Sequence, residues 1–250
     1  DGDWSSDVCS SDLVQMIIWG GAAMPRELIS RLLDFDCPLA TNYGMTESGS
    51  AITVIPPTRD VDLLEKTVGW PFPGTEVRLV DRNGQPVADG EDGEIQSRSI
   101  YNMLGYWRRP DASAETLSPE GWLATGDLGR RNPDGSYSIV GRVKEMYKSG
   151  GYNVYPREVE QVIESHPAVE MAAVVSTEDR VWQEVGVAYV LPSREVSSEE
   201  LRAWCRDRLA NYKLPKLFVI VAQLPLLPIG KVDKVTLTQR AERDYQPSPA

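Results

Sequence analysis

The sequence predicts a fold of mixed α/β and α+β class, in which a larger first part is followed by a small α+β domain. Residues 14–143 alternate apolar runs of strand length with helical segments and glycine turns. After Lys144 the pattern becomes helix, strand, strand, helix and strand, which suffices for a domain of about 100 residues. We therefore expect a boundary near Lys144, a small domain over residues 144–240 and a tail over residues 241–250.

The bulk composition is that of an ordinary globular protein and argues against several classes of function. The 250 residues are 41% apolar and 25% charged, and the formal net charge is −11. Nucleic acids and anionic membranes repel an acidic chain, and no apolar run reaches the length of a membrane span. We expect neither nucleic-acid binding nor a transmembrane segment.

Cysteine and histidine are too few and too scattered for most metal-site or triad chemistry. The three cysteines form no C-x-x-C motif, and a reducing, cytoplasmic location is the default for such a chain. The only histidine, His166, precedes Pro167 at the end of a predicted helix. We expect a structural role for His166, because a zinc site or a His-based triad needs further partners.

The first thirteen residues differ from the rest of the chain. Residues 1–13 are polar and aperiodic, and they lack the basic and apolar regions of a targeting signal. We expect them to be a non-native extension that contributes nothing to folding. The apolar run VQMIIWGG at residues 14–21 then begins abruptly, and its length and composition predict a buried strand. Because the first recognisable element is a buried strand, we expect elements of the fold to be missing upstream.

The remaining elements are predicted from turn residues and from apolar spacing. Before Lys144, the pattern predicts a helix over 25–35 that starts at Pro25, a strand within 38–49 that enters a glycine turn, short strands over 68–100 with a hairpin turn at Asn83-Gly84, and a strand over 136–142. After Lys144, it predicts a helix from Pro156 to Pro167, strands over 169–175 and 186–191, a helix over 197–212 with a capping box from Ser197 to Glu200, and a strand over 217–221.

Two segments of the first part carry oxygen groups suited to a nucleotide. In NYGMTES, Thr46 can donate to a phosphate oxygen, and Glu47 is a hard ligand of the kind that Mg²⁺ prefers. A simple helix cap is the alternative for this pair. In WLATGDLGR, Asp127 lies in a predicted tight turn, where it can accept hydrogen bonds from a ribose diol or cap the turn.

Two segments of the second part carry cations beside glycine. GRVKEMYKSGGYNVYP places Arg142, Lys144 and Lys148 before Gly150-Gly151, although a basic turn ahead of a surface helix would have the same composition. LPIGKVDK places Lys231 after Gly230 in a proline-bounded loop, where most lysines are merely solvated.

Together and in this order, these segments resemble the adenylate-forming superfamily of acyl-CoA synthetases, peptide-synthetase adenylation domains and luciferases. The resemblance extends from Val14 to about Leu237, and each motif is weak when it is taken alone. The motifs are GGAAMP, NYGMTE, VGWPFPG, GEIQSRSIYNMLGYW, TGDLGR, GRVKEMYKSGGYNVYPREVE and PIGKVDK. The resemblance implies a two-step reaction: ATP and a small carboxylic acid give an acyl-adenylate and pyrophosphate, and a thiol, commonly that of coenzyme A, then takes the acyl group.

The resemblance also implies a role for each matched residue. ATP and Mg²⁺ would be bound in the first part. Gly20, Gly21 and Ala22 would line the acyl and adenine pockets. Asn42, Tyr43 and Gly44 would bind the nucleotide, with the Tyr43 ring stacked on adenine. Thr46 would hold the α-phosphate, Glu47 would bind Mg²⁺, and Asp127 would bind the ribose. In the second part, Arg142 would lie beside the ribose, the small domain would pivot at Lys144, Lys148, Gly150 and Gly151 would face the site during thiol transfer to coenzyme A, and Lys231 would act during adenylation.

The sequence departs from the family pattern in ways that leave alternatives open. The Ser/Thr/Gly-rich phosphate-binding loop is absent, so the resemblance is to the C-terminal half of an acyl-CoA ligase, and we expect the N-terminal half of the same enzyme to be missing. Glu145 stands where Asp is common. The remaining alternatives are an adenylation domain that loads a carrier protein, and an inactive fragment that retains weak nucleotide or coenzyme A binding. The motifs do not distinguish a fatty acid from an aryl acid.

Overall fold

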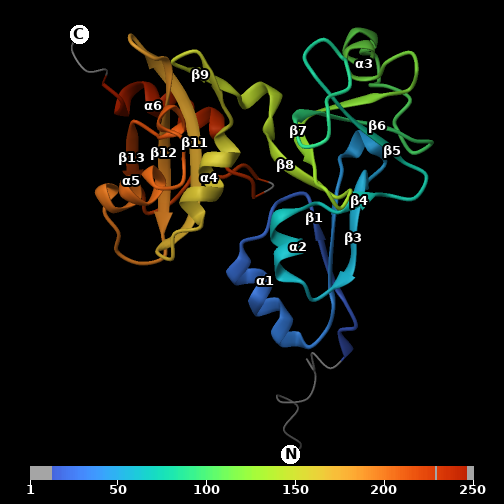
Figure 1. Ribbon diagram of the computed structural model, residues 1–250, viewed down its shortest axis with the longest axis horizontal. Coiled ribbons are helices and arrows are strands. Elements are labelled where there is room, and N and C mark those ends of the chain that lie inside the picture. The colour runs from blue at the N-terminus through green and yellow to red at the C-terminus, as the bar shows by residue number, and fades with distance from the viewer. Residues whose placement is uncertain (1–12, 229, 247–250) are drawn as a thin grey trace, which may run out of the picture. The chain divides into compact units, whose positions relative to one another are not determined.

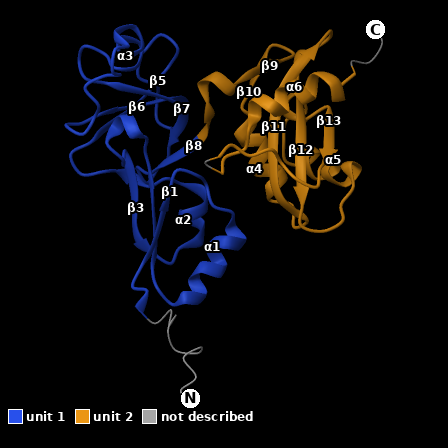
Figure 2. Ribbon diagram, turned by 180° about the vertical axis from the view of Figure 1, so that it is seen from behind, with its two compact units in different colours: residues 1–139 blue, residues 140–250 orange. Residues whose placement is uncertain are grey.

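The chain divides into two units, each built around β-structure. The computed structural model describes residues 13–228 and 230–246. Unit 1 comprises Asp1–Ile139 and unit 2 comprises Val140–Ala250 (Figure 2). The expected non-native extension lies outside the described residues except for Leu13, and the end of the expected tail, from residue 247, lies outside them too. In the described part, no helix is long and apolar enough to cross a membrane.

The first sheet of unit 1 carries helices on one face (Figure 1). Its four strands lie in the order β1 (Ile17–Gly20), β2 (Leu39–Tyr43), β3 (Thr53–Thr58) and β4 (Trp70–Pro71). Strands β1 and β2 are parallel, as the intervening helix α1 (Arg26–Leu32) permits, and the other pairs are antiparallel. Together with α2 (Val61–Lys66), α1 closes a core around Ile29, Leu39, Ile55 and Leu64.

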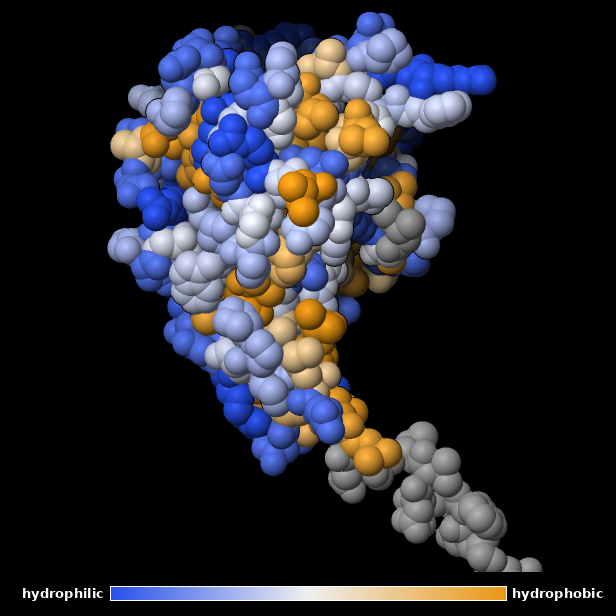
Figure 3. All heavy atoms as spheres, turned by 90° about the vertical axis from the view of Figure 1, so that its right-hand side faces the viewer, coloured by the Kyte–Doolittle hydropathy of each residue, from blue (hydrophilic) through white to orange (hydrophobic). Residues whose placement is uncertain are grey.

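Strand β1 is half-buried on one face and exposed on the other, so the prediction of a buried strand was wrong. Ile17 and Trp19 pack toward the helices, whereas Ile18, which points the other way, is 55% exposed. Within the described residues β1 pairs only with β2. Apolar residues therefore gather on the surface near the point where the described chain begins (Figure 3).

The second sheet of unit 1 is built from consecutive strands. Its order is β5 (Glu76–Val80), β6 (Asp92–Arg98), β7 (Leu123–Arg131) and β8 (Tyr137–Arg142), and α3 (Pro110–Thr116) lies between β6 and β7 in the chain. The division between the units falls within β8, after Ile139. The predicted turn at Asn83-Gly84 is confirmed, since Gly84 has a φ of 75° and its N–H donates to the Asp81 carbonyl at 3.0 Å.

Unit 2 is a sheet covered by helices on both faces. Its strands are β9 (Tyr147–Ser149), β10 (Tyr152–Val154), β11 (Val169–Asp179), β12 (Gln183–Pro192) and β13 (Leu217–Ile220), in the order β10-β9-β12-β11, and β13 pairs with β12. Its helices are α4 (Pro156–Glu164), α5 (Ser198–Arg206) and α6 (Lys234–Asp244). The predicted helices and strands of this part are all present, with shifted ends.

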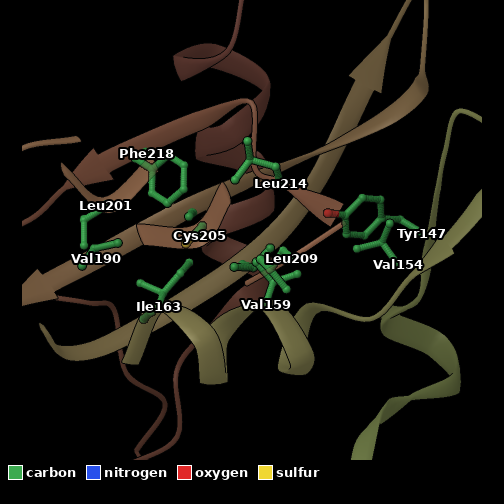
Figure 4. Packing of buried hydrophobic residues seen from close by; sticks show 13 residues of the cluster. Tyr147, Val154, Val159, Ile163, Val190, Leu201, Cys205, Leu209, Leu214 and Phe218 are labelled. Carbon is green, nitrogen blue, oxygen red and sulfur yellow. The ribbon is translucent and has the colours of Figure 1, made fainter. Parts of the chain in front are cut away.

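Alternation along β11 and β12 supplies an apolar surface to each face of this sheet. Val190 belongs to the cluster that contains Val159 of α4 and Leu201 of α5 (Figure 4). Val174 belongs to the same cluster. The neighbouring residues Ala173, Val175, Val187 and Tyr189 form a second cluster with Leu237 and Ala241 of α6. The sheet therefore has a core on each side, and α6 covers one of them.

Helix α6 was not predicted, and it includes the first four residues of the segment expected to be a tail. The Asp233 carboxylate caps it by accepting the Thr236 N–H at 3.1 Å. Beyond its end, the Tyr245 hydroxyl donates to Asp179 at 2.7 Å. The helix has a narrow apolar face, because Leu237 is fully buried whereas Val235 is 71% exposed. Such a narrow face gives a weak periodic signal.

His166 has the structural role that was expected for it. Its side chain is buried, its Nδ1 accepts the Ala168 N–H at 3.2 Å, and its ring lies edge-on to Trp204 at 4.9 Å. The predicted cap of α5 is present, since the Ser197 hydroxyl accepts the Glu200 N–H at 3.1 Å. The Glu200 carboxylate contacts His166 Nε2 at 3.4 Å.

A two-residue hairpin turn joins β9 to β10. Gly150 and Gly151 form it with φ of 58° and 85°, which a primed turn requires and which side chains resist. The Gly150 N–H donates to the Trp182 carbonyl at 2.8 Å. A Cβ atom at Gly150 would lie 2.8 Å from the Trp182 ring, whereas one at Gly151 would meet nothing within 4 Å.

We expect Leu237→Ala to lower the free energy of unfolding by about 2–5 kcal/mol, because it opens a cavity under α6. Val235→Ala is the matched control on the exposed face of the same helix, and it should change that free energy by less than about 0.5 kcal/mol. Urea-induced unfolding followed by circular dichroism measures both. Equal effects of the two substitutions would show that α6 does not cover the sheet.

We expect Gly150→Ala to destabilise the protein more than Gly151→Ala does. Both variants place a side chain at positive φ, which costs about 1–2 kcal/mol, but only the first also presses a methyl group against Trp182. Thermal unfolding of the two variants gives the difference. Replacing Trp182 by Leu should reduce the difference in stability between Gly150→Ala and Gly151→Ala. A difference that stays the same without Trp182 would point to another cause.

Candidate active site

The site residues expected from the sequence fall into two sets, one in each unit. The set in unit 1 surrounds the carboxyl ends of β1 and β2, where ligands commonly bind in sheets with parallel strands. Gly20 lies opposite Asn42 in this parallel pair, and a Cβ atom at Gly20 would lie 2.4 Å from Asn42 Oδ1. The chain then turns at Gly21, whose φ is 83°, and leads to Ala22.

Tyr43 and Asp127 are joined directly. The Tyr43 hydroxyl donates to Asp127 Oδ2 at 2.8 Å, although 84 positions separate the two residues in the sequence. One residue comes from the end of β2 and the other from β7, so this hydrogen bond connects the two sheets of unit 1. The residues expected to bind adenine and ribose are thus neighbours.

Asp127 lies in a bulge of β7, so the predicted tight turn was wrong. Glu94 of β6 pairs with Leu128 and Gln96 pairs with Ala124, which leaves the residues between these partners out of the regular ladder. The Thr125 hydroxyl fixes the bulge: it donates to the Ile95 carbonyl at 2.8 Å and accepts the Asp127 N–H at 3.1 Å. A bulge re-aims a side chain at the cost of ladder hydrogen bonds.

Thr46 and Glu47 lie in the short helix η3 (Thr46–Ser48), but neither caps it. The residue before the helix is Met45, whose N–H donates to the Ser48 hydroxyl at 3.1 Å. Gly44 allows this turn to close, because a Cβ atom there would overlap the Ser50 carbonyl. The hydroxyl of the exposed Thr46 is therefore not used as the helix cap that the sequence left as an alternative.

Tyr106 is a neighbour of the site for which the sequence predicted no role. Its hydroxyl donates to Glu47 Oε1 at 2.9 Å, and the Met103 N–H donates to the Glu47 carbonyl at 2.7 Å. The hydrogen bond to Glu47, assisted by burial, raises the pKa of Tyr106 above its ordinary value. The resemblance had included the motif YNMLGYW, which is the signal that contains Tyr106.

Glu47 fits a magnesium ion that is shared with a nucleotide. Among the described residues, no three His, Cys, Asp or Glu side chains are grouped closely enough to hold a metal by themselves. Protein Mg²⁺ sites at nucleotides typically use one or two carboxylates and complete the coordination with phosphate oxygens and water. A single carboxylate that is held by Tyr106 at one oxygen meets that requirement.

The cations in unit 2 are exposed and lie on successive short elements. Arg142 ends β8, Lys144 lies in the short helix η4 (Val143–Glu145), and Lys148 is in β9 next to the glycine turn. The Lys148 N–H donates to the Glu184 carboxylate at 3.1 Å. Trp182, for which the sequence predicted no role, packs on this turn.

Lys231 lies on a separate tight turn of unit 2. The Leu227 N–H donates to the Lys231 carbonyl at 2.7 Å, and Leu226 forms a bridge with Val232. Gly230 has a φ of 80°, so it allows the chain to reverse directly before Lys231. The Lys231 side chain is exposed.

Curated proteins with similar sequences are named as ligases of carboxylic acids. The chain is 39% identical over 239 residues to the feruloyl-CoA synthase of Amycolatopsis sp., and this alignment covers 95% of this chain and 48% of that protein. It is 38% identical over 216 residues to the 2-succinylbenzoate–CoA ligase of Geobacillus kaustophilus, and this alignment covers 86% of this chain and 44% of that protein. The chain spans about half the length of these relatives.

Solved structures of similar fold are adenylate-forming enzymes. The amide bond synthetase McbA from Marinactinospora thermotolerans superposes with a TM-score of 0.82 at 34% identity, over 90% of this chain and 46% of that one. The o-succinylbenzoate CoA synthetase MenE from Bacillus subtilis, in complex with its acyl-adenylate intermediate, gives 0.79 at 32% identity, over 95% and 47%. The expected mixed fold class is confirmed.

Two family models match the chain, one in each unit. The model of the AMP-binding enzyme matches residues 5–107, beginning within the segment that was set aside as non-native, and that of the AMP-binding enzyme C-terminal domain matches residues 158–231. Together with the relatives and the structures, these matches show that the chain belongs to the AMP-binding family of adenylate-forming enzymes.

Proposed function

We propose that this chain supplies the C-terminal part of an AMP-forming acid–thiol ligase. The enzyme would join ATP and a carboxylic acid into an acyl-adenylate with release of pyrophosphate, and would then pass the acyl group to the thiol of coenzyme A with release of AMP. The observation that carries this proposal is the hydrogen bond of 2.8 Å between Tyr43 and Asp127, because it joins a flat aromatic ring to a carboxylate. A nucleoside presents the matching pair of groups, a base and a diol.

The residues of unit 1 would hold the nucleotide during the first step. The Tyr43 ring would stack on adenine, and the Asp127 carboxylate would accept hydrogen bonds from the ribose hydroxyls. The Thr46 hydroxyl would donate to the α-phosphate. Mg²⁺, bound through Glu47, would neutralise phosphate charge. Gly20 and Gly21 would let the acyl group approach the backbone.

The chemical step needs positioned charge and no protein nucleophile. A carboxylate oxygen of the acid attacks the α-phosphorus, and the bond from that phosphorus to the pyrophosphate oxygen breaks. Negative charge builds up on the α-phosphate as this happens, and the Lys231 ammonium would stabilise it. Catalysis by positioned charge does not require a histidine. It is therefore consistent with His166 being buried in a structural contact with Trp204.

The residues around the glycine turn would serve the second step. The coenzyme A thiol attacks the acyl carbon, and AMP leaves. Gly150 and Gly151 would leave room for the pantetheine arm, and Lys148 beside them would attract the anionic cofactor. Arg142 would lie beside the ribose, and Lys144 would be the pivot about which the small domain turns between steps. We also propose that the reaction takes place in the cytoplasm.

A carrier protein is the second candidate for the acyl acceptor. One relative, 35% identical over 228 residues, is named as the fatty acid–[acyl-carrier-protein] ligase ScoC of Streptomyces coeruleorubidus. Coenzyme A stands first because several of the other relatives, feruloyl-CoA synthase among them, are named for CoA thioesters. The acyl acceptor can be tested directly with both thiols.

We expect residues 14–250 to support catalysis when they replace the matched C-terminal part of feruloyl-CoA synthase from Amycolatopsis. The hybrid should catalyse ferulate-dependent exchange of pyrophosphate into ATP and should form feruloyl-CoA. The parent enzyme is the positive control, and a parent truncated at the junction is the negative one. A hybrid that unfolds cooperatively but shows no more exchange than the truncated parent would favour the inactive-fragment interpretation.

We expect Lys231→Ala and Lys148→Ala in this hybrid to affect different half-reactions. Loss of Lys231 should slow pyrophosphate exchange by about a hundredfold or more, because one stabiliser of the developing charge is removed, and should spare conversion of supplied acyl-adenylate to thioester. Loss of Lys148 should slow thioester formation and spare exchange.

Lys66→Ala provides a control at an exposed surface ion pair, and it should change either step by less than about 0.5 kcal/mol. Separate assays of pyrophosphate exchange and of single-turnover thioester formation measure the two steps. Equal losses in both steps for both lysines would contradict the division of labour between them.

A further inference from the structure

Lys234 ties together three segments of unit 2. It is the first residue of α6, and its Nζ lies 2.5 Å from Glu145 Oε2 and 2.8 Å from Glu160 Oε1. Glu145 belongs to η4, which follows β8, and Glu160 belongs to α4. The Lys234 side chain is only 27% exposed, so these ion pairs are largely screened from water. The proposed function uses none of these three residues.

The Glu160 end of this network is fixed to the core. The Glu160 side chain is 5% exposed, and its Oε1 also accepts the Val174 N–H of β11 at 2.9 Å. A buried carboxylate needs cations, and Glu160 has a second one, because its Oε2 lies 3.5 Å from Arg157 Nη1. Lys234 makes the shorter of the two contacts, and its removal would leave Glu160 with the longer one only. Burial by itself lowers the pKa of Lys234, but the attraction of Glu160 and Glu145 outweighs this effect and raises the pKa above its ordinary value. The ammonium therefore stays charged at neutral pH.

The other end of the network leads directly to the turn that carries Lys231. Lys234 follows Lys231 by three positions, and the Asp233 N–H between them donates to the Pro225 carbonyl at 2.8 Å. The Leu227 N–H closes the turn on the Lys231 carbonyl at 2.7 Å. A displacement of Lys234 should therefore also move Lys231, because a short, hydrogen-bonded stretch of backbone joins the two residues.

We propose that Lys234 is a positioning residue that locks the Lys231 turn to the segment containing Lys144 and Glu145. The catalytic lysine and the pivot then form one rigid body through Lys234. This inference rests on the proposed roles of Lys231 and Lys144. A solely structural ion pair would stabilise unit 2 as a whole and would have no particular effect on the turn.

The chain offers a matched control for this inference. Lys213 in the short helix η5 (Asn211–Lys213) lies with its Nζ 2.5 Å from Glu158 Oε1, which is also on α4. Its side chain is 20% exposed, close to the value for Lys234. Its partner is more exposed than Glu160, at 34% against 5%, so the control matches the helix and the burial of the lysine but not the burial of the acid. Lys213→Met therefore removes an ion pair to the same helix without touching the Lys231 turn.

Hydrogen–deuterium exchange of the 250-residue chain measures the rigidity of the turn. In Lys234→Met, the backbone amides of residues 225–233 should exchange at least about tenfold faster than in the unmodified chain, because their anchor is lost. In Lys213→Met their rate should not change, and Lys234→Arg should restore most of the protection. Exchange within about twofold of the unmodified rate in Lys234→Met would overturn the proposal.

Glu145→Gln decides the question if Lys234→Met fails to fold. This variant keeps the buried Lys234–Glu160 pair and removes only the charge at the pivot. Faster exchange in both residues 225–233 and residues 143–149 supports the lock. Faster exchange in residues 143–149 alone overturns it, and so does unchanged exchange in both.

The hybrid ligase links this result to catalysis. Lys234→Met should lower kcat for pyrophosphate exchange about tenfold, with the KM for ATP unchanged, whereas Lys213→Met should leave both parameters as they are. If every hybrid is inactive, the proposed function fails, and the exchange measurements on the chain still decide the role of Lys234. If Lys234→Met loosens the turn but leaves kcat unchanged, the positioning role in catalysis is refuted.

Discussion

The burial of both faces of one sheet determines the architecture of unit 2. Alternate residues of β11 and β12 are apolar on either side, so one layer of helices cannot cover them. Helices α4 and α5 cover one face, and the chain must return to cover the other with α6. The segment that leads into α6 is the turn with Lys231. The position of the proposed catalytic lysine is thus a by-product of completing a hydrophobic core.

In unit 1, the candidate site depends on a hydrogen bond between the two sheets. Tyr43 ends a strand of the helix-covered sheet, and Asp127 comes from the antiparallel sheet. Regular ladder pairing is interrupted at the β7 bulge that presents Asp127. The Thr125 hydroxyl replaces some of the missing ladder hydrogen bonds, because it bonds the Ile95 carbonyl and the Asp127 N–H. Neither sheet alone supplies both groups, so the integrity of the candidate nucleotide site depends on the contact between the sheets.

The sequence predicted the elements with strong periodicity and the motifs with chemically distinctive residues. Helix α4, the two long strands after it and the capped start of α5 follow from local patterns, which remain visible when tertiary context is unknown. Local patterns cannot reveal how many faces of a strand are covered, and this is why β1 was taken to be buried. They also cannot distinguish a bulge from a turn at Asp127, because glycine and a short polar residue suit both.

The residues that support the site were the hardest to find from the sequence. Tyr106, Trp182 and Lys234 act on neighbours that are distant in the chain, so spacing gives no indication of their partners. Lys234 lies within the motif PIGKVDK but had no assigned role, because the sequence did not predict the helix that begins at this residue. Only the fold brings it to Glu145 and Glu160.

The half-covered strand β1 has a consequence for handling the protein. Within the described residues its outer edge carries backbone N–H and C=O groups that no neighbouring strand engages, and Ile18 is an exposed apolar side chain on the same strand. Such an edge is a template for strand addition, whether by further polypeptide of the same enzyme or by a second copy of the chain. Association of the 250-residue chain through β1 would increase with concentration, and a lysine in place of Ile18 would oppose it.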